Sequence, residues 1–232
     1  MLDRLGPYEL GPGGEHEGIY TGDARLLSEA IPDESVDLIF TDPVYQNIDD
    51  YRWLAETAAR VLRTNGVCLA WYGGKRLAAA IVAMTEGLEF AWILNYVVPA
   101  KTRFLHCGVF PWTTQCLYLR KNHGRPQRAI PDTFISHSRP SGQHKWNKNI
   151  GVIQYWLQAF MTADEIAFDP FTGGGTVPAA CKMLGRRYLA FEILPDEAET
   201  ARERVRMTQM PLFVLEHEQA EMTLGGDWWP GW

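Results

Sequence analysis

The sequence lacks the features of secreted, disulfide-bonded and zinc-binding proteins. None of its four cysteines forms a Cys-x-x-Cys pair; they are Cys68, Cys107, Cys116 and Cys181. Scattered cysteines suit a reducing cytoplasm and argue against a disulfide framework or a zinc ribbon. The spacing of His106, Cys107, Cys116 and His123 fits no standard metal site, so we expect no metal.

Long apolar runs are also absent, and none approaches the length of a membrane span. The first residues, MLDRLGPYELGPGG, contain no hydrophobic signal-peptide region, so we expect a cytoplasmic protein with no membrane partner. The 232 residues show no internal repeat, and 46% are hydrophobic and 22% charged. These values are ordinary for one globular domain with a full core.

The basic residues are concentrated in one part of an acidic chain. Residues 99–150 hold nine lysines and arginines against Asp132, a net charge of +8, whereas the whole chain carries −6. The rest of the chain therefore carries −14. A basic block on an acidic protein indicates a polyanionic partner, although a solvated basic loop would have the same composition.

Apolar runs with the character of strands alternate with helical patterns along the chain. We predict strands at 18–23, 35–41, 67–72, 90–98, 113–120, 165–169 and 187–193. Helices are predicted at 51–63, 75–87, 151–160, 176–184 and 195–207, with Gly185 ending one and Pro195 starting another. Alternation of this kind predicts an α/β domain whose mostly parallel sheet is covered on both faces. The tails 1–17 and 216–232 are predicted to be irregular.

The segment FDPFTGGGT, Phe168–Thr176, places three glycines between a predicted strand and a predicted helix. Glycines let the backbone approach a ligand closely, and the helix start offers unpaired N–H groups. A P-loop would need a lysine after the turn, but Thr176 and Val177 follow Gly175, which argues against ATP. A dinucleotide and S-adenosylmethionine both remain open, because Glu192 at the end of the next strand could bind ribose hydroxyls in either case. A tight turn without a ligand is the remaining alternative.

Two further phrases give the chain a resemblance to a known family. GDARLLSEAIPDESVDLIFTDPVY (Gly22–Tyr45) resembles the Gly-Asp turn and the Asp-Pro-Pro-Tyr motif of amino-methyltransferases that modify adenine N6 or cytosine N4 in DNA. HKWNKNIGVIQYWLQAF and the glycine turn resemble their cofactor-binding half. The catalytic motif comes first, as in the permuted β class of this family. The resemblance covers most of residues 18–207 and implies a Rossmann-like methyltransferase fold with a seven-stranded, mostly parallel sheet and one antiparallel strand near the edge.

The resemblance divides the chain into three functional parts. Residues 18–98 would form the catalytic half, 99–143 an inserted basic target-recognition region, and 144–207 the cofactor-binding half. The cofactor would be S-adenosylmethionine, and the partner would be DNA, either a duplex with a flipped target base or a single strand, in a bacterial or phage-infected cell. The resemblance leaves the oligomeric state open, with a homodimer as one alternative.

The resemblance also implies roles for individual residues. Asp42 and the Pro43 carbonyl would accept the two N–H bonds of the target amino group, and Tyr45 would stack on the extruded base. The implied cofactor-binding residues are Asp23, Lys148, Asp169, Pro170, Phe171, Thr172, Gly173, Gly174, Gly175, Thr176 and Glu192. The implied nucleic-acid contacts are Lys101, Arg103, Arg120, Lys121, Arg125, Arg128, Arg139 and Lys145.

Two departures from the family pattern bear on activity. Val44 replaces the second proline of the catalytic motif, and Asn149 replaces the proline after Lys148. The aspartate in Asp-Pro-x-Tyr favours adenine N6 over cytosine N4. C5 methylation of cytosine is disfavoured, because no cysteine follows a proline. The open alternatives are a cytosine-N4 enzyme, a non-catalytic nucleic-acid-binding partner, an RNA methyltransferase and a dinucleotide oxidoreductase.

Overall fold

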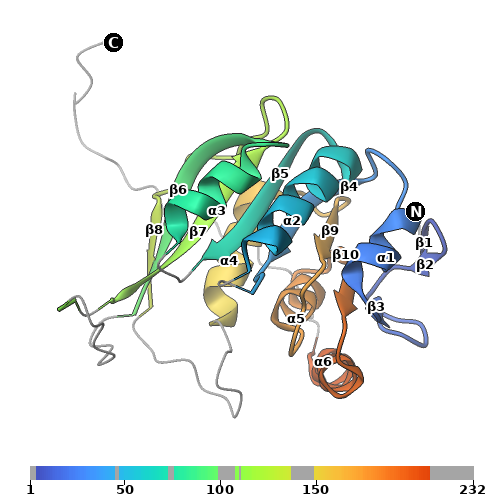
Figure 1. The fold of residues 1–232 in the computed structure, drawn as a ribbon. Coiled ribbons are helices and arrows are strands. Elements are labelled where there is room, and N and C mark those ends of the chain that lie inside the picture. The colour runs from blue at the N-terminus through green and yellow to red at the C-terminus, as the bar shows by residue number, and fades with distance from the viewer. Residues whose placement is uncertain are drawn as a thin grey trace.

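A single mixed sheet forms the centre of the protein. The computed structural model describes residues 4–44, 47–72, 76–98, 108–109, 111–136 and 149–209. Within them, eight strands are ordered β3-β10-β9-β4-β5-β7-β6-β8 (Figure 1). The strands are β3 (Ile19–Thr21), β4 (Val36–Thr41), β5 (Leu62–Tyr72), β6 (Glu89–Val97), β7 (Thr113–Arg120), β8 (Thr133–Ile135), β9 (Ile166–Asp169) and β10 (Arg187–Glu192).

Seven of these eight strands run in the same direction, and β7 runs antiparallel to β5 and β6. The seven parallel strands therefore end at one edge of the sheet, which we call the carboxyl edge, and the opposite one is the amino edge. Strand β7 begins at the carboxyl edge, since Thr113 pairs with Val97. Ligand sites in open α/β sheets lie outside the carboxyl ends of the strands, so this edge is where a site is expected.

Helices cover both faces of the sheet. Helices α1 (Ala24–Leu27), α2 (Ile48–Val61) and α3 (Leu77–Met84) lie on one face, and α4 (Ile150–Phe160), α5 (Thr176–Met183) and α6 (Pro195–Met207) on the other (Figure 1). Strand β4 shows why both faces are buried. Its Ile39 packs in the core under α2, while Leu38 and Phe40 pack in the core beside α4, and all three are fully buried. The α/β fold class predicted from the alternation is confirmed.

Local sequence signals set the ends of several helices. The side chains of Asn47 and Asn149 accept backbone N–H groups at the starts of α2 and α4. Pro195 begins α6, and Gly185, at a φ of 63°, follows α5. These two predicted end signals are confirmed, because proline suits the first helical turn and glycine tolerates a left-handed φ.

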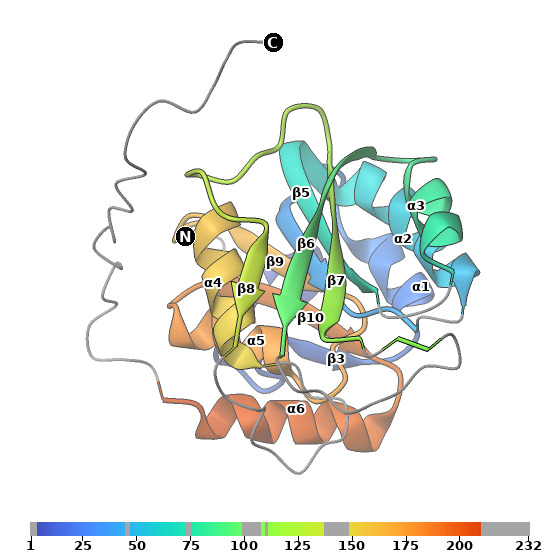
Figure 2. The same cartoon turned by 90° about the vertical axis from the view of Figure 1, so that its left-hand side faces the viewer.

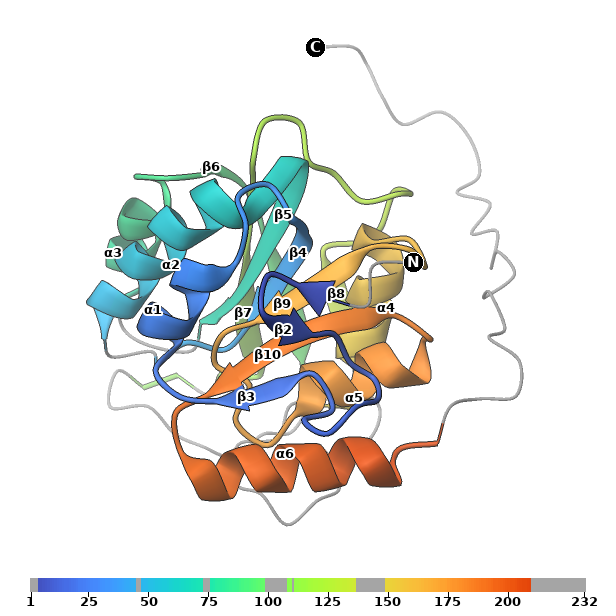
Figure 3. The same ribbon diagram turned by 90° about the vertical axis from the view of Figure 1, so that its right-hand side faces the viewer.

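The amino-terminal segment is built into the fold. Short strands β1 (Arg4–Leu5) and β2 (Tyr8–Glu9) form an antiparallel pair near β3 and β10 (Figure 3). Gly11 then bridges to Tyr188 of β10 through two backbone hydrogen bonds of 2.9 and 3.1 Å. The prediction of an irregular tail at 1–17 is wrong for this part, because buried Leu5, Tyr8 and Leu10 anchor it. The predicted tail 216–232 lies outside the described residues.

Pairing across the sheet also changes the boundaries drawn on the sequence. Strand β3, placed by sequence in the catalytic half, pairs with β10 of the cofactor-binding half (Figure 3). Strand β7, placed by sequence in the inserted region 99–143, lies inside the sheet between β5 and β6, and β8 extends the sheet at β6 (Figure 2). Within the described residues the sheet therefore has eight strands where seven were expected, and its one antiparallel strand, β7, is third from the β8 end, near the edge as expected. These errors arise because strand partners far apart in the chain are fixed by tertiary packing.

Candidate active site

Three loops meet at the carboxyl edge. Strands β4 and β9 are neighbours, and so are β9 and β10. The residues that follow them therefore come close in space although they are far apart in sequence: Asp42 after β4, the glycine turn after β9 and Ile193 after β10. The two motifs that the sequence assigned to catalysis and to cofactor binding thus share one edge of the sheet.

A buried hydrogen bond joins the first two of these strand ends. The hydroxyl of Thr41, the last residue of β4, donates to Oδ1 of Asp169, the last residue of β9, at 2.7 Å. Thr41 is 1% exposed and Asp169 4% exposed. The residue that precedes Asp42 in the chain is therefore bonded to the residue that opens the glycine turn.

The carboxyl group of Asp169 lies in a desolvated place. Burial raises its pKa from the ordinary value to about 7. The hydroxyls of Thr41 and Thr172 and the N–H of Phe171 lower the pKa, and the nearby charge of Asp42 raises it. A cationic group placed at this edge would stabilise the ionised carboxylate.

Asp42 is half-buried near the aromatic side chain of Tyr51. Tyr51 of α2 is fully buried, and its hydroxyl donates to the Trp71 carbonyl at 2.9 Å. Burial first, and then the charge of Asp42, raise the pKa of Tyr51, so the phenol stays neutral next to the carboxylate. Pro43 is buried and Val44 is 62% exposed. Tyr45 lies outside the described residues.

The glycine turn is hydrogen-bonded to the end of β10. The Gly173 N–H donates to Glu192 Oε2 at 2.8 Å, and the Leu194 N–H donates to Oε1 of the same carboxylate at 3.0 Å. The Thr172 N–H donates to the Phe191 carbonyl at 3.0 Å. Gly173 has a φ of 47°, and a Cβ added there would meet no atom of the described residues within 4 Å. The turn therefore leaves open space in front of a carboxylate, which suits a ligand.

Helices α5 and α6 hold the far side of the turn. Gly175, at a φ of 73°, lies so close to α6 that an added Cβ would be 2.8 Å from the Cβ of Ala201. Arg204 of α6 donates to the Gly174 carbonyl and to the Thr176 hydroxyl, both at 2.9 Å. Only glycine at position 175 permits this approach of the two helices.

A second cluster borders the site on the α1 and α2 side. Asp23 caps α1 by accepting the Arg25 N–H at 2.9 Å. The Arg25 guanidinium donates to Asp50 at 2.6 Å and lies 5.6 Å from the ring centre of Trp53. The Trp53 ring packs edge-on against Phe171 at 5.5 Å, which connects this cluster to the glycine turn. Asp23, Phe171 and Glu192 thus border the same edge.

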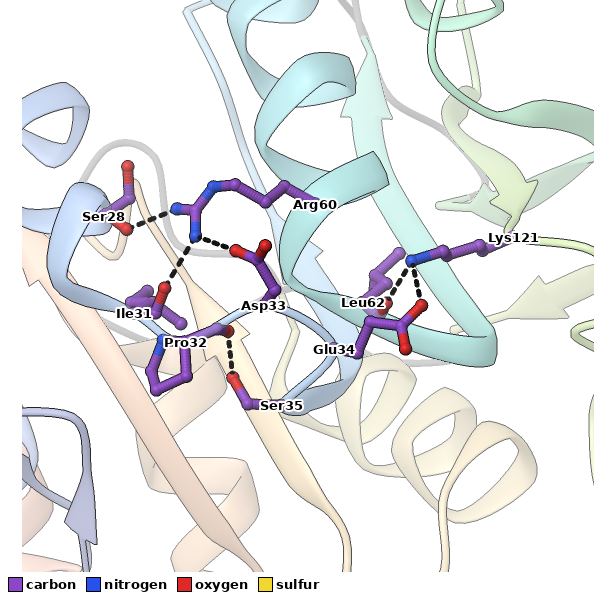
Figure 4. Close-up of polar contacts among 9 residues, drawn as sticks. All are labelled: Ser28, Ile31, Pro32, Asp33, Glu34, Ser35, Arg60, Leu62 and Lys121. Carbon is purple, nitrogen blue, oxygen red and sulfur yellow. Dashed lines mark hydrogen bonds and ion pairs between the residues drawn. The ribbon is translucent and has the colours of Figure 1, made fainter.

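Part of the basic block lies at the amino edge. Arg120 ends β7 there and pairs with Glu89, and Lys121 donates to the Glu34 carboxylate at 3.0 Å and to the Leu62 carbonyl at 2.8 Å (Figure 4). The family resemblance implied nucleic-acid contacts for Arg120 and Lys121. Their place opposite Asp42 and their ion pairs favour a structural role instead.

Arg125 and Arg128 are exposed in the loop after Lys121, and the Gln127 N–H between them donates to Ala159 near the end of α4. They too lie away from Asp42, because α4 ends at the amino edge, just before β9 begins. The other predicted residues, Lys101, Arg103, Arg139, Lys145 and Lys148, lie outside the described residues.

These five basic residues lie in two segments of the chain, and the described residues on either side of each segment lie at the carboxyl edge. Val98 follows the end of β6, and its N–H donates to the Trp112 carbonyl at 2.8 Å. Ser136 follows the end of β8 and accepts a bond from the Asn149 side chain at 3.0 Å. Trp112 itself is 50% exposed. Val98 and Trp112, on either side of 99–111, and Ser136 and Asn149, on either side of 137–148, therefore lie on the side of the sheet that carries Asp42.

The family model for DNA methylases of the N6/N4 type matches residues 86–203, about half of the chain, including β9, the glycine turn and β10. The chain belongs to the N6/N4 family of DNA methylases. This N6/N4 methylase is 24% identical over 207 residues to "Putative methylase YubD" of Escherichia coli strain K12, covering 81% of this chain and 89% of that protein.

Two solved structures of methyltransferases share the fold. The crystal structure of the M1.HpyAVI–SAM complex matches with a TM-score of 0.71 and 22% identity, over 82% of this chain and 98% of that one. The PvuII DNA methyltransferase, described as cytosine-N4-specific, matches with a TM-score of 0.69 and 17% identity, over 80% and 85% of the two chains. At these identities the likeness establishes a methyltransferase fold and leaves the target base open.

Three residues of the candidate site were not found from sequence: Thr41, Tyr51 and Arg204. Thr41 had one signal, since it ends a buried strand directly before Asp42. Tyr51 and Arg204 had none, because they reach the site from helices whose packing is decided by the fold. Among the described residues, no group of three or more histidine, cysteine or acidic side chains gathers as a metal site, and no helix is long and apolar enough to cross a membrane.

Proposed function

We propose that this protein is an S-adenosylmethionine-dependent DNA methyltransferase that modifies an exocyclic amino nitrogen, with adenine N6 as the target. One observation carries the proposal. Asp42 of the DPVY segment and the glycine turn meet at the carboxyl edge, and Thr41 and Asp169 bond the two strand ends together. Membership in the N6/N4 family supports the reaction class.

The residues around the glycine turn fit S-adenosylmethionine. The open space at Gly173 and the start of α5 suit its amino-acid portion, and the buried carboxyl of Asp169 suits its cationic ammonium group. Glu192 would accept the ribose hydroxyls, and Phe171 beside Trp53 would border the adenine end near Asp23. When bound, the cofactor supplies a methyl group on a sulfonium centre.

Asp42 and Pro43 make the target nitrogen reactive. An exocyclic amino nitrogen is a weak nucleophile, since its lone pair is delocalised into the ring. If the Asp42 carboxylate and the Pro43 carbonyl accept its two N–H bonds, the nitrogen becomes pyramidal and its lone pair points away from them. Asp42 would also stabilise the positive charge that develops on nitrogen as it accepts the methyl group, and the surplus proton would pass to Asp42 or to water.

The base must leave its stack to reach Asp42, and Tyr45 would stack on it once extruded. We assign phosphate contacts to Lys101, Arg103, Arg139 and Lys145, whose flanking residues lie at the carboxyl edge. Exposed Trp112 at the same edge offers a further aromatic surface.

Transfer of labelled methyl groups from S-adenosylmethionine to mixed-sequence DNA tests the proposal. Label in N6-methyladenine supports the proposal. Label found only in N4-methylcytosine would show that the target base is cytosine and not adenine. RNA run in parallel separates the two nucleic acids. DNA binding without label would favour a non-catalytic protein, and Val44 in the catalytic motif is the feature that supports this second candidate. Calorimetry that shows binding of NAD and not of S-adenosylmethionine would contradict the proposal.

A further inference from the structure

The hydroxyl of Thr41 links the strand end before Asp42 directly to the glycine turn. This hydroxyl donates at 2.7 Å to a carboxylate 128 positions later in the chain, and both side chains are buried. The bond ends on Asp169 Oδ1, which also accepts the Phe171 N–H at 3.2 Å. Two donors on one oxygen fix the plane of the carboxylate toward the glycine turn.

The groups that face Asp169 come from three elements. Asp42 follows β4, Thr172 belongs to the glycine turn and Cys181 lies on α5. Burial raises the pKa of the Cys181 thiol to about 12, so the thiol carries no charge at neutral pH. Among the described residues, the charged neighbour is Asp42, which disfavours ionisation of Asp169, while the hydroxyl of Thr41 favours it.

We propose that Thr41 is a positioning residue for the cofactor: its hydroxyl keeps the Asp169 carboxylate ionised and oriented toward the ammonium group of bound S-adenosylmethionine. This inference rests on the proposed function. It assigns a task to the residue before the catalytic aspartate, and it makes the protonation of the cofactor pocket depend on the catalytic loop.

The sign of the pH dependence follows from the raised pKa. Asp169 has a pKa of about 7, so below that pH the carboxyl is protonated and must release its proton before it pairs with a cation. Cofactor affinity therefore falls as the pH drops through about 7. Removing the Thr41 hydroxyl raises the pKa of Asp169, so the loss of cofactor affinity begins at a higher pH. Removing the charge of Asp42 lowers the pKa of Asp169 and moves the fall to lower pH.

Carboxyl carbon NMR of the ligand-free protein tests the first half of the inference. The Asp169 signal is assigned by its loss in Asp169→Asn and is titrated in wild type, Thr41→Ser, Thr41→Val and Asp42→Asn. We expect Thr41→Ser to titrate like wild type, Thr41→Val about one pH unit higher, as one hydrogen bond to a charged group implies, and Asp42→Asn lower. Thermal melting of each variant separates a general loss of stability from these opposite changes in titration. An unchanged Asp169 titration in Thr41→Val overturns the inference.

Calorimetry with S-adenosylmethionine between pH 6 and 8 tests the second half. We expect Thr41→Val to bind up to about tenfold more weakly than wild type near pH 6.5, because a titration midpoint about one pH unit higher leaves about one tenth as much ionised Asp169 on the acid side. Thr41→Ser should match wild type. If Thr41→Val binds S-adenosylmethionine with the affinity and the pH profile of the wild-type protein, the inference is overturned and the proposed function still stands. Absence of binding by wild type at every pH would overturn both.

Discussion

The N–H of Gly173 donates to the Glu192 carboxylate at 2.8 Å, so the glycine turn after β9 and the acid that ends β10 form one hydrogen-bonded unit. Glu192 is 8% exposed and also accepts the Leu194 N–H at 3.0 Å. The residue proposed to bind ribose hydroxyls thus holds the turn proposed to bind the amino-acid portion of the cofactor. Binding and positioning are therefore combined in one side chain.

Replacement of Glu192 should weaken cofactor binding in steps. Glu192→Gln keeps one carbonyl oxygen and loses the charge, so it retains one of the two bonds to backbone N–H groups. Glu192→Ala loses both and should bind more weakly still, by more than tenfold relative to wild type, because a bond to a charged group contributes about 1.5–3 kcal/mol. Calorimetry with S-adenosylmethionine measures both variants, and exposed Glu203→Gln on α6 is the control. Equal affinity for Glu192→Ala and the control would remove Glu192 from the site.

Asp42→Ala should abolish methyl transfer while it changes cofactor affinity by less than about tenfold, or about 1.4 kcal/mol. The reason is that, under the proposed function, Asp42 acts on the target amino group, whereas the cofactor contacts lie in the glycine turn. Label transfer to DNA and calorimetry measure the two quantities on the same preparation. Methyl transfer by Asp42→Ala at nearly the wild-type rate would show that the catalytic assignment is wrong.

Arg204→Met should destabilise the glycine turn by removing its hydrogen bonds to α6. Arg204 donates to the Gly174 carbonyl and the Thr176 hydroxyl, and its loss leaves these groups without that donor. We expect a loss of about 1–3 kcal/mol in the free energy of unfolding, together with weaker cofactor binding. Arg206→Met is the matched control two residues away, since Arg206 makes a surface ion pair with Glu199 that should contribute less than about 1 kcal/mol. Urea unfolding compares the two, and equal losses would argue against this role of Arg204.

Gly175→Ala should cost more stability than Gly173→Ala. Both glycines have a positive φ, which an alanine adopts at a cost of about 1–2 kcal/mol. At Gly175 the added Cβ also meets Ala201 at 2.8 Å, and such overpacking adds about 1–3 kcal/mol, whereas the space at Gly173 is open. Urea unfolding of both variants measures the difference, and a larger loss for Gly173→Ala would contradict the close contact of α5 and α6.

The salt dependence of DNA binding should separate the two parts of the basic block. The double variant Lys101→Gln, Arg103→Gln should make the slope of log affinity against log salt shallower by up to about two, because each phosphate contact contributes about 0.9. The double variant Arg120→Gln, Lys121→Gln should leave the slope unchanged, since both side chains pair with acids at the amino edge. A shallower slope for the second variant would place DNA at that edge as well.

The order of strands and helices could be predicted from sequence because each depends on local signals. Strand β7 is observed at the predicted residues, and α6 begins at Pro195 and ends at Met207 as predicted. The missed elements are short: β1, β2, β8 and α1 have two to four residues each, too few for a periodic pattern. Tertiary partners stabilise them, as when buried Leu5 and Tyr8 hold the amino-terminal pair against the core.

The site divides in the same way between sequence and structure. The sequence alone determined which groups are available for chemistry: a carboxylate and a proline carbonyl in DPVY, glycines before a helix, and an acid at the end of the next strand. Only the tertiary structure decided which of these groups meet, because adjacency of β4, β9 and β10 joins Thr41 to Asp169 and Gly173 to Glu192. The same packing moved Arg120 and Lys121 away from Asp42, since an antiparallel β7 carries its last residues to the opposite edge. Charge composition is a property of the chain, whereas the place of each charge depends on the direction of its strand.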